Sequence, residues 1–146
     1  MDIFINNTAS CIALSAAGIF FMAGLLTGLW KYLCMRTHPQ AEAPYYVSTA
    51  HRAALMYAFS AQLLGVFASI SAFPGWVNTV AVIPPLVFFG ISIVHYVQLG
   101  MTTLSNNSLR DSAEKSKDYL ILNVLAVAEI GGFGVLLLGF FIRLWG

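Results

Sequence analysis

The chain of 146 residues is 59% apolar and only 9% charged, whereas a soluble domain is about 25% charged and under about 50% apolar. This composition excludes an ordinary water-soluble domain, and we expect residues 1–146 to form a single transmembrane domain. The net charge of +1 contains no basic block, so nucleic acid is not expected as a partner.

Four apolar stretches each reach the roughly 20 residues that cross a hydrocarbon core. They cover residues 10–34, 50–72, 77–101 and 119–144. A lone strand would leave backbone groups unpaired in lipid, and the alternation of a barrel strand is absent, so all four are predicted helices. The Pro-Gly turn at residues 73–76 makes the second and third spans antiparallel. We therefore expect an all-α, antiparallel bundle of four transmembrane helices in contact with membrane lipid.

Glycines and prolines indicate where the spans pack. Gly24 and Gly28 in the first span form a GxxxG pattern that permits close helix contact, within the bundle or between subunits. A second glycine patch lies on the fourth span, at residues 131, 132 and 134. Pro84 and Pro85 remove two amide donors from the third span and predict a kink or local unwinding.

Basic residues predict the orientation in the membrane. Six of the seven Lys and Arg residues lie at the loops that join the first span to the second and the third span to the fourth. By the positive-inside rule, both loops are cytoplasmic and both termini face outward. We expect an integral protein of a bacterial inner (cytoplasmic) membrane.

Ionisable residues inside the spans mark candidate sites, because each costs at least a few kcal/mol in hydrocarbon. His51 and Arg52 open the second span, His95 lies near the end of the third, and Glu129 lies in the fourth. His51 is expected one or two residues after the start of its helix. Its depth in the membrane then differs from that of His95 by about 6–8 Å, so the two side chains can face one pocket.

Each of these residues also has a structural alternative. Arg52 can extend to the lipid headgroups, and His95 can bond a carbonyl in the packed bundle. Glu129, near the midplane with Gln62, can link helices instead of acting as an acid. Tyr57 is expected at about the same depth as His95. The polar groups therefore lie at successively greater depths from the cytoplasmic side toward the midplane.

Histidine in a membrane span is a candidate iron ligand, since haem takes one or two axial histidines. The chain contains no Cys-x-x-Cys-His, which excludes attached c-type haem, and its Cys and His spacing fits no zinc pattern. The 11 Phe residues can line a planar apolar cofactor or substrate, or can equally face lipid.

Two short segments, taken together, are similar to a known family. They are Gly24-Leu25-Leu26-Thr27-Gly28-Leu29-Trp30 in the first span and Ala50-His51-Arg52-Ala53-Ala54-Leu55-Met56 at the start of the second. The pair resembles the small four-span family that contains styrene oxide isomerase and hydroxylaminobenzene mutase. As a layout, the resemblance covers about residues 15–140.

The resemblance implies a homotrimer with haem b at its subunit contacts and His51 as the iron ligand, and we expect Arg52 beside it in the cofactor site. It implies a redox-neutral isomerisation in which ferric haem acts as a Lewis acid on a small aromatic epoxide or hydroxylamine-type substrate. Tyr96 matches the tyrosine that positions substrate in the family.

The chain departs from the family at two positions, where Tyr57 and Ser92 replace asparagines. We expect both to line the catalytic site together with Tyr96 and His95. Two other functions stay open. If His95 ligates iron opposite His51, the chain is a bis-histidine b-type cytochrome; a haem-free small-solute transporter or assembly subunit is the third possibility.

Overall fold

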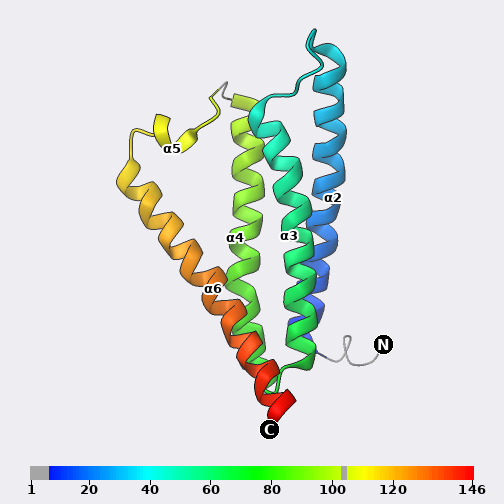
Figure 1. Ribbon diagram of the computed structural model, residues 1–146, viewed down its shortest axis with the longest axis vertical. Helices are drawn as coiled ribbons and strands as arrows, with labels where there is room; N and C mark the ends of the chain where they lie inside the picture. Colours follow the sequence, from blue (N-terminus) through cyan, green and yellow to red (C-terminus); the bar gives the residue numbers. More distant parts are fainter. Residues whose placement is uncertain (1–6, 103–104) are drawn as a thin grey trace.

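The computed structural model describes residues 7–102 and 105–146, and the described residues form helices without a strand. The long helices are α2 (Thr8–Thr37), α3 (Tyr45–Ile70), α4 (Gly75–Thr102) and α6 (Lys115–Trp145), and α5 (Ser108–Asp111) is a single turn between α4 and α6. Each long helix is long and apolar enough to cross a membrane. This confirms the predicted all-α chain with four candidate membrane spans. Successive long helices run in opposite directions along the long axis (Figure 1).

The start of α3 differs from its prediction in a way that matters for the site. The helix begins at Tyr45 behind an N-cap proline, Pro44, whereas the apolar run begins at residue 50. His51 is therefore six residues beyond the helix start, and His95 is seven residues before the end of α4. At about 1.5 Å per residue, the two histidines lie about 9 and 10 Å from their helix ends. The expected depth difference of 6–8 Å was wrong.

Helices α2 and α3 pack closely because alanine and glycine line their contact. Ala13 and Ala61 are fully buried there. Hydrogen bonds add to this contact near the N-terminus of α2: the Asn7 amide donates to the Ala68 carbonyl at 3.0 Å, and the Ser10 hydroxyl donates to the Gly65 carbonyl at 2.9 Å. This pairing fixes the rotation of α3 against α2.

Helix α4 stays continuous through Pro84 and Pro85, so the predicted local unwinding does not occur. Pro85 has no amide hydrogen, which leaves the Ala81 carbonyl without its usual helical donor. Gly132 of α6 lies against that carbonyl so closely that a Cβ there would be 2.4 Å from the oxygen. Because Gly132 has no side chain, the α6 backbone can pack directly on the turn of α4 that contains Pro85.

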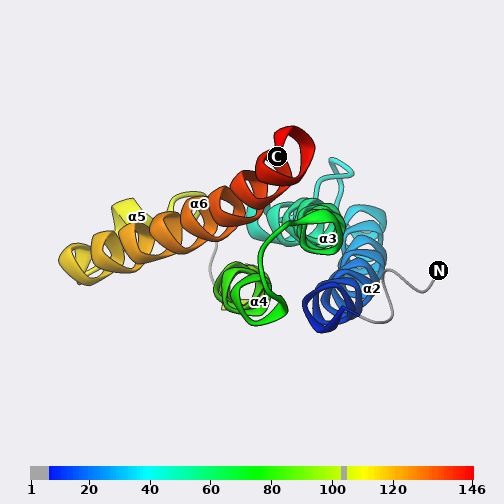
Figure 2. The same ribbon diagram turned by 90° about the horizontal axis from the view of Figure 1, so that it is seen from below.

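Helix α6 packs on the bundle over only part of its length. Seen from below, α2, α3 and α4 form a cluster, while α6 crosses outside it and its N-terminal end projects away with α5 (Figure 2). The buried residues of α6 are Leu136 and Gly139, both in its C-terminal half. The N-terminal half of α6 diverges from α4 (Figure 1) and exposes large apolar side chains such as Leu120 and Val127.

Candidate functional site

His51 projects from α3 toward α2 and bonds to the α2 backbone. Its Nδ1 lies 2.8 Å from the carbonyl oxygen of Gly24. A carbonyl can only accept a hydrogen bond, so Nδ1 must carry the proton. In the tautomer that this bond selects, the lone pair is on Nε2, and Nε2 makes no hydrogen bond among the described residues.

Gly28 makes room for the His51 ring. A Cβ at residue 28 would lie 2.8 Å from Cε1 and 3.0 Å from Nδ1 of His51, closer than side chains approach. The buried Thr27 hydroxyl donates to the Ala23 carbonyl at 2.7 Å and lies 3.1 Å from the Gly24 carbonyl. Gly24 and Gly28 of α2 thus both lie against one imidazole, and the two segments that carry the family resemblance contact each other in the fold.

The GxxxG pattern therefore allows close contact between two helices of one chain. A Cβ at Gly24 would lie 2.6 Å from Leu55 of α3, and Gly28 faces His51, which is also on α3. In the fourth span, Gly132 faces α4. A Cβ at Gly131 or Gly134 would instead have nothing from a neighbouring helix within 4 Å. Only the latter two remain open to a contact outside the chain.

A second cluster lies between α3 and α4. The Tyr57 ring stacks on Phe89, with ring centroids 4.4 Å apart. The Tyr57 hydroxyl lies within hydrogen-bonding reach of the Ser92 side chain. Tyr57 and Ser92, which the sequence predicts to line one site, are therefore neighbours that share one polar contact.

Tyr96 continues this cluster toward the connector between α4 and α6. Its ring stacks parallel to Tyr46 with centroids 6.3 Å apart, and the His95 ring lies 6.1 Å from it at a tilt. The side chain of His95 is exposed. The structure thus brings together Tyr57, Ser92 and Tyr96, with His95 at the edge of the group.

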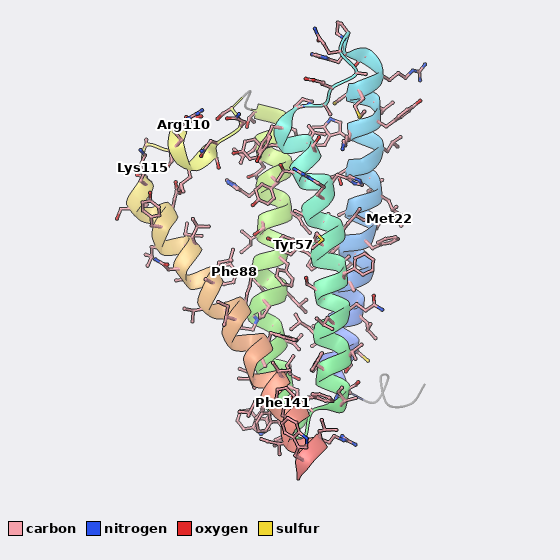
Figure 3. All side chains as sticks on the ribbon, viewed as in Figure 1. Met22, Tyr57, Phe88, Arg110, Lys115 and Phe141 are labelled. Carbon is pink, nitrogen blue, oxygen red and sulfur yellow. The ribbon has the colours of Figure 1, made fainter. Side chains whose placement is uncertain are left out.

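The two clusters lie on different faces of α3. Six residues of helix correspond to about 600°, so Tyr57 points about 120° away from His51 around the helix axis. His51 faces α2, and Tyr57 faces α4 (Tyr57 is labelled in Figure 3). Arg52 is exposed. In the described part of one chain, the candidate iron ligand therefore lies on the α2 side of α3 and Tyr57 on its α4 side.

Glu129 is a polar residue of this region for which the sequence left two roles open, an acid or a link between helices. Its Oε1 is buried and has no hydrogen-bond partner in the described part of the chain. The side chain is only partly exposed and comes from α6, which packs on both α3 and α4. The sequence signal was its charge inside a span; its neighbours could be found only from the packing of α6.

The donor set fits a single axial ligand to haem iron. A metal-binding histidine characteristically donates its other ring N–H to a carbonyl or carboxylate, which fixes the tautomer and orients the ring. His51 has this arrangement through Gly24. No group of three His, Cys, Asp or Glu side chains within residues 7–102 and 105–146 is placed to hold a metal ion without such a cofactor.

Comparison of the chain with protein-family models, curated proteins and solved structures found no match.

Proposed function

We propose that this chain is a haem b-dependent membrane isomerase that acts without net redox on a small aromatic epoxide or hydroxylamine-type substrate. The observation that carries the proposal is the 2.8 Å bond from His51 Nδ1 to the Gly24 carbonyl, which leaves Nε2 with a lone pair for iron. The resemblance to the styrene oxide isomerase and hydroxylaminobenzene mutase family supports it, because the two resembling segments build this arrangement.

His51 would hold the cofactor, and the neighbouring exposed Arg52 would bind its carboxylate groups. When bound, ferric haem supplies a Lewis acid that polarises a substrate oxygen. Tyr57, Ser92, Tyr96 and His95 would form the substrate side, where stacked rings hold an aromatic group and hydroxyls orient its polar atom.

A homotrimer would join the two halves of the site. One chain places His51 toward α2 and the Tyr57 cluster toward α4, so a site that uses both needs the His51 of one copy near the α4 side of another. The exposed apolar N-terminal half of α6 and the open Gly131 and Gly134 are compatible with such a contact.

We place the protein in a bacterial inner membrane with both termini outside, because six of the seven Lys and Arg residues flank the two long loops. Labelling a cysteine introduced at Ser108 tests this orientation. Reaction from the outer face of intact cells would contradict it.

A bis-histidine cytochrome is the second candidate, favoured by the similar distance of His51 and His95 from their helix ends. The two candidates make opposite spectral predictions. An isomerase needs an open or exchangeable iron position, so its ferric spectrum should respond to substrate. A cytochrome should be low-spin, and His95→Ala should make it high-spin.

The test is turnover of ferric protein, purified in detergent from cells supplied with haem, without added reductant. Isomerisation of styrene oxide or phenylhydroxylamine, lost in His51→Ala, would support the isomerase. An unresponsive low-spin spectrum without turnover would favour the cytochrome, and colourless wild-type protein would contradict both.

A further inference from the structure

Gln62 is an amide side chain on the surface of a candidate membrane span. It lies eight residues before the end of α3, about 12 Å from that end along the helix. The side chain is exposed, and its amide group makes no hydrogen bond within residues 7–102 and 105–146. Lipid tails cannot pair with an amide, and an unpaired polar group in hydrocarbon is costly. The position therefore favours an occupant that has a hydrogen-bonding group.

An open groove of about 430 Å³ adjoins Gln62 between α2 and α3, which lie side by side in both views (Figures 1 and 2). Its lining is apolar apart from Gln62. Three lining residues, Ala17, Gly18 and Ala58, have little or no side chain, and a Cβ at Gly18 would have no neighbour within 4 Å. The small residues thus leave a hollow beside the amide group.

Phe21 of α2 and Phe59 of α3 contribute one aromatic ring to the groove from each helix. They are 46% and 64% exposed, so the bundle covers neither ring fully. Helices pack closely on flat patches of small residues, which two large exposed rings interrupt. A flat aromatic molecule instead gains contact with both rings. A mostly apolar and aromatic lining with one polar group, at this volume, is typical of a small-molecule site.

The groove is separate from the residues assigned to the cofactor and the substrate. Ala58 and Gln62 follow His51 by seven and eleven residues. They therefore point within about 20° of the direction of His51 around α3 and lie about 10–17 Å further along the helix. The groove is on the α2 side of α3, whereas Tyr57 faces α4, and neither His51 nor Tyr57 lines it.

We propose that this groove binds a small aromatic molecule that carries a hydroxyl or carbonyl oxygen. Gln62 forms a hydrogen bond with that oxygen, and Phe21 and Phe59 contact the aromatic ring. An amide both donates and accepts, so it pairs with either kind of oxygen. The ligand dissolves in the membrane and enters the groove from the lipid. The site goes beyond the proposed function, because it requires neither haem nor His51.

The experiment photolabels the full chain in phosphatidylcholine nanodiscs with 4-azidophenol, and mass spectrometry locates the labelled residues. Phenol and toluene, which have nearly the same shape and differ in one hydrogen-bonding group, compete with the label. The variants are Gln62→Leu and Gly18→Leu, which fills the groove. The matched control is Gln98→Leu, at an exposed glutamine of α4. Because all proteins are compared in the same lipid, the partitioning of each competitor into the membrane cancels.

We expect the label within residues 14–21 and 58–62 of the wild type. Gln62→Leu should raise the phenol concentration for half-inhibition about 3- to 10-fold, because one neutral hydrogen bond is lost, and change that of toluene by less than about twofold. Gln98→Leu should match the wild type. Gly18→Leu should abolish the labelling of these residues.

Label spread evenly over the lipid-exposed helix faces, or an unchanged response to phenol in Gln62→Leu, would overturn the proposal. It would also be overturned by an unlabelled wild type together with a smaller oligomer of Gln62→Leu in native mass spectrometry, since a second copy of the chain would then cover the groove. Circular dichroism checks that each variant is folded. If Gln62→Leu does not fold, Gly18→Leu decides.

Discussion

The imidazole of His51 lies against the backbone of Gly28 with no room for a side chain between them. A Cβ at residue 28 would be 2.8 Å from Cε1 of His51. The same ring donates from Nδ1 to the Gly24 carbonyl. Two glycines one helical turn apart therefore position a histidine of the next helix. Gly24 accepts a hydrogen bond from its ring, and Gly28 leaves space for the ring because it has no side chain.

Gly28→Ala should displace the His51 ring and lengthen its bond to Gly24. Because that bond orients Nε2, we expect haem affinity to fall about 10- to 100-fold, as is typical when the partner that orients a metal ligand is lost, and the haem content of the purified chain to fall with it. Haem content is measured from the Soret absorbance and the protein concentration.

The control for this variant is Gly18→Ala on the same helix, where nothing lies within 4 Å of a built Cβ. Unchanged haem content in both variants would show that the close contact with Gly28 does not orient the ligand.

The contact of Gly132 with α4 should matter for stability. A Cβ there would clash with the Ala81 carbonyl and the Pro85 ring, so Gly132→Ala should destabilise the bundle by about 1–3 kcal/mol, the usual cost of overpacking. Gly18→Ala should instead stabilise α2 by about 0.5–1 kcal/mol, because alanine has the higher helix propensity and the position is open. Reversible unfolding in detergent measures both, and a stabilising Gly132→Ala would refute the packing.

The hydrogen bond between Tyr57 and Ser92 should appear as a coupling between two substitutions. Tyr57→Phe keeps the stacking on Phe89 and removes only the hydroxyl. We expect Tyr57→Phe and Ser92→Ala each to cost about 0.5–1.5 kcal/mol of unfolding free energy. The double variant should cost no more than the larger single loss, since both remove the same bond. Additive losses would mean that the hydroxyls have separate partners.

The Arg110–Asp111 pair predicts a pH effect in the connector, outside the candidate membrane spans. Hydrogen bonds from the Arg110 guanidinium and the Ser105 hydroxyl lower the pKa of the Asp111 carboxyl group from 3.8 to about 2. A lowered folded-state pKa stabilises the connector above the ordinary value of 3.8, and this contribution is lost as the pH falls through about 2.

Carbon NMR of the Asp111 carboxyl group should therefore give a midpoint near 2 in the wild type. Arg110→Gln should raise that midpoint toward 3.8. Lys117→Gln, which removes the neighbouring exposed pair with Glu114, should leave it in place. A wild-type midpoint near 3.8 would show that the pair does not form in solution.

The four spans were predictable because a helix that crosses the hydrocarbon core of a membrane must be about 20 residues long and mostly apolar. Both properties can be read from the sequence. The start of α3 was not, because residues 45–49 include tyrosine, serine and threonine, and a helix can continue past the apolar run that identifies it. Because α3 begins earlier than predicted, His51 lies further from the helix start than expected, at a distance from its helix end similar to that of His95.

The candidate site was only partly predictable. Sequence position identified His51, Tyr57 and Glu129 as polar residues inside spans, but it did not give the rotation of α3 that turns His51 to α2 and Tyr57 to α4. That rotation depends on small residues of α2 such as Ala13 and Gly28, which lie directly against α3. The position of Glu129 depended in turn on Gly132 lying against Pro85.

In the proposed function, His51 holds haem iron through Nε2. Its most direct test is the Soret absorbance of purified His51→Gly protein with and without added imidazole, beside the wild type. We predict a band in the wild type, no band in folded His51→Gly, and recovery of the band when imidazole replaces the missing ligand. A colourless wild type, or a full band in His51→Gly without imidazole, would contradict the claim.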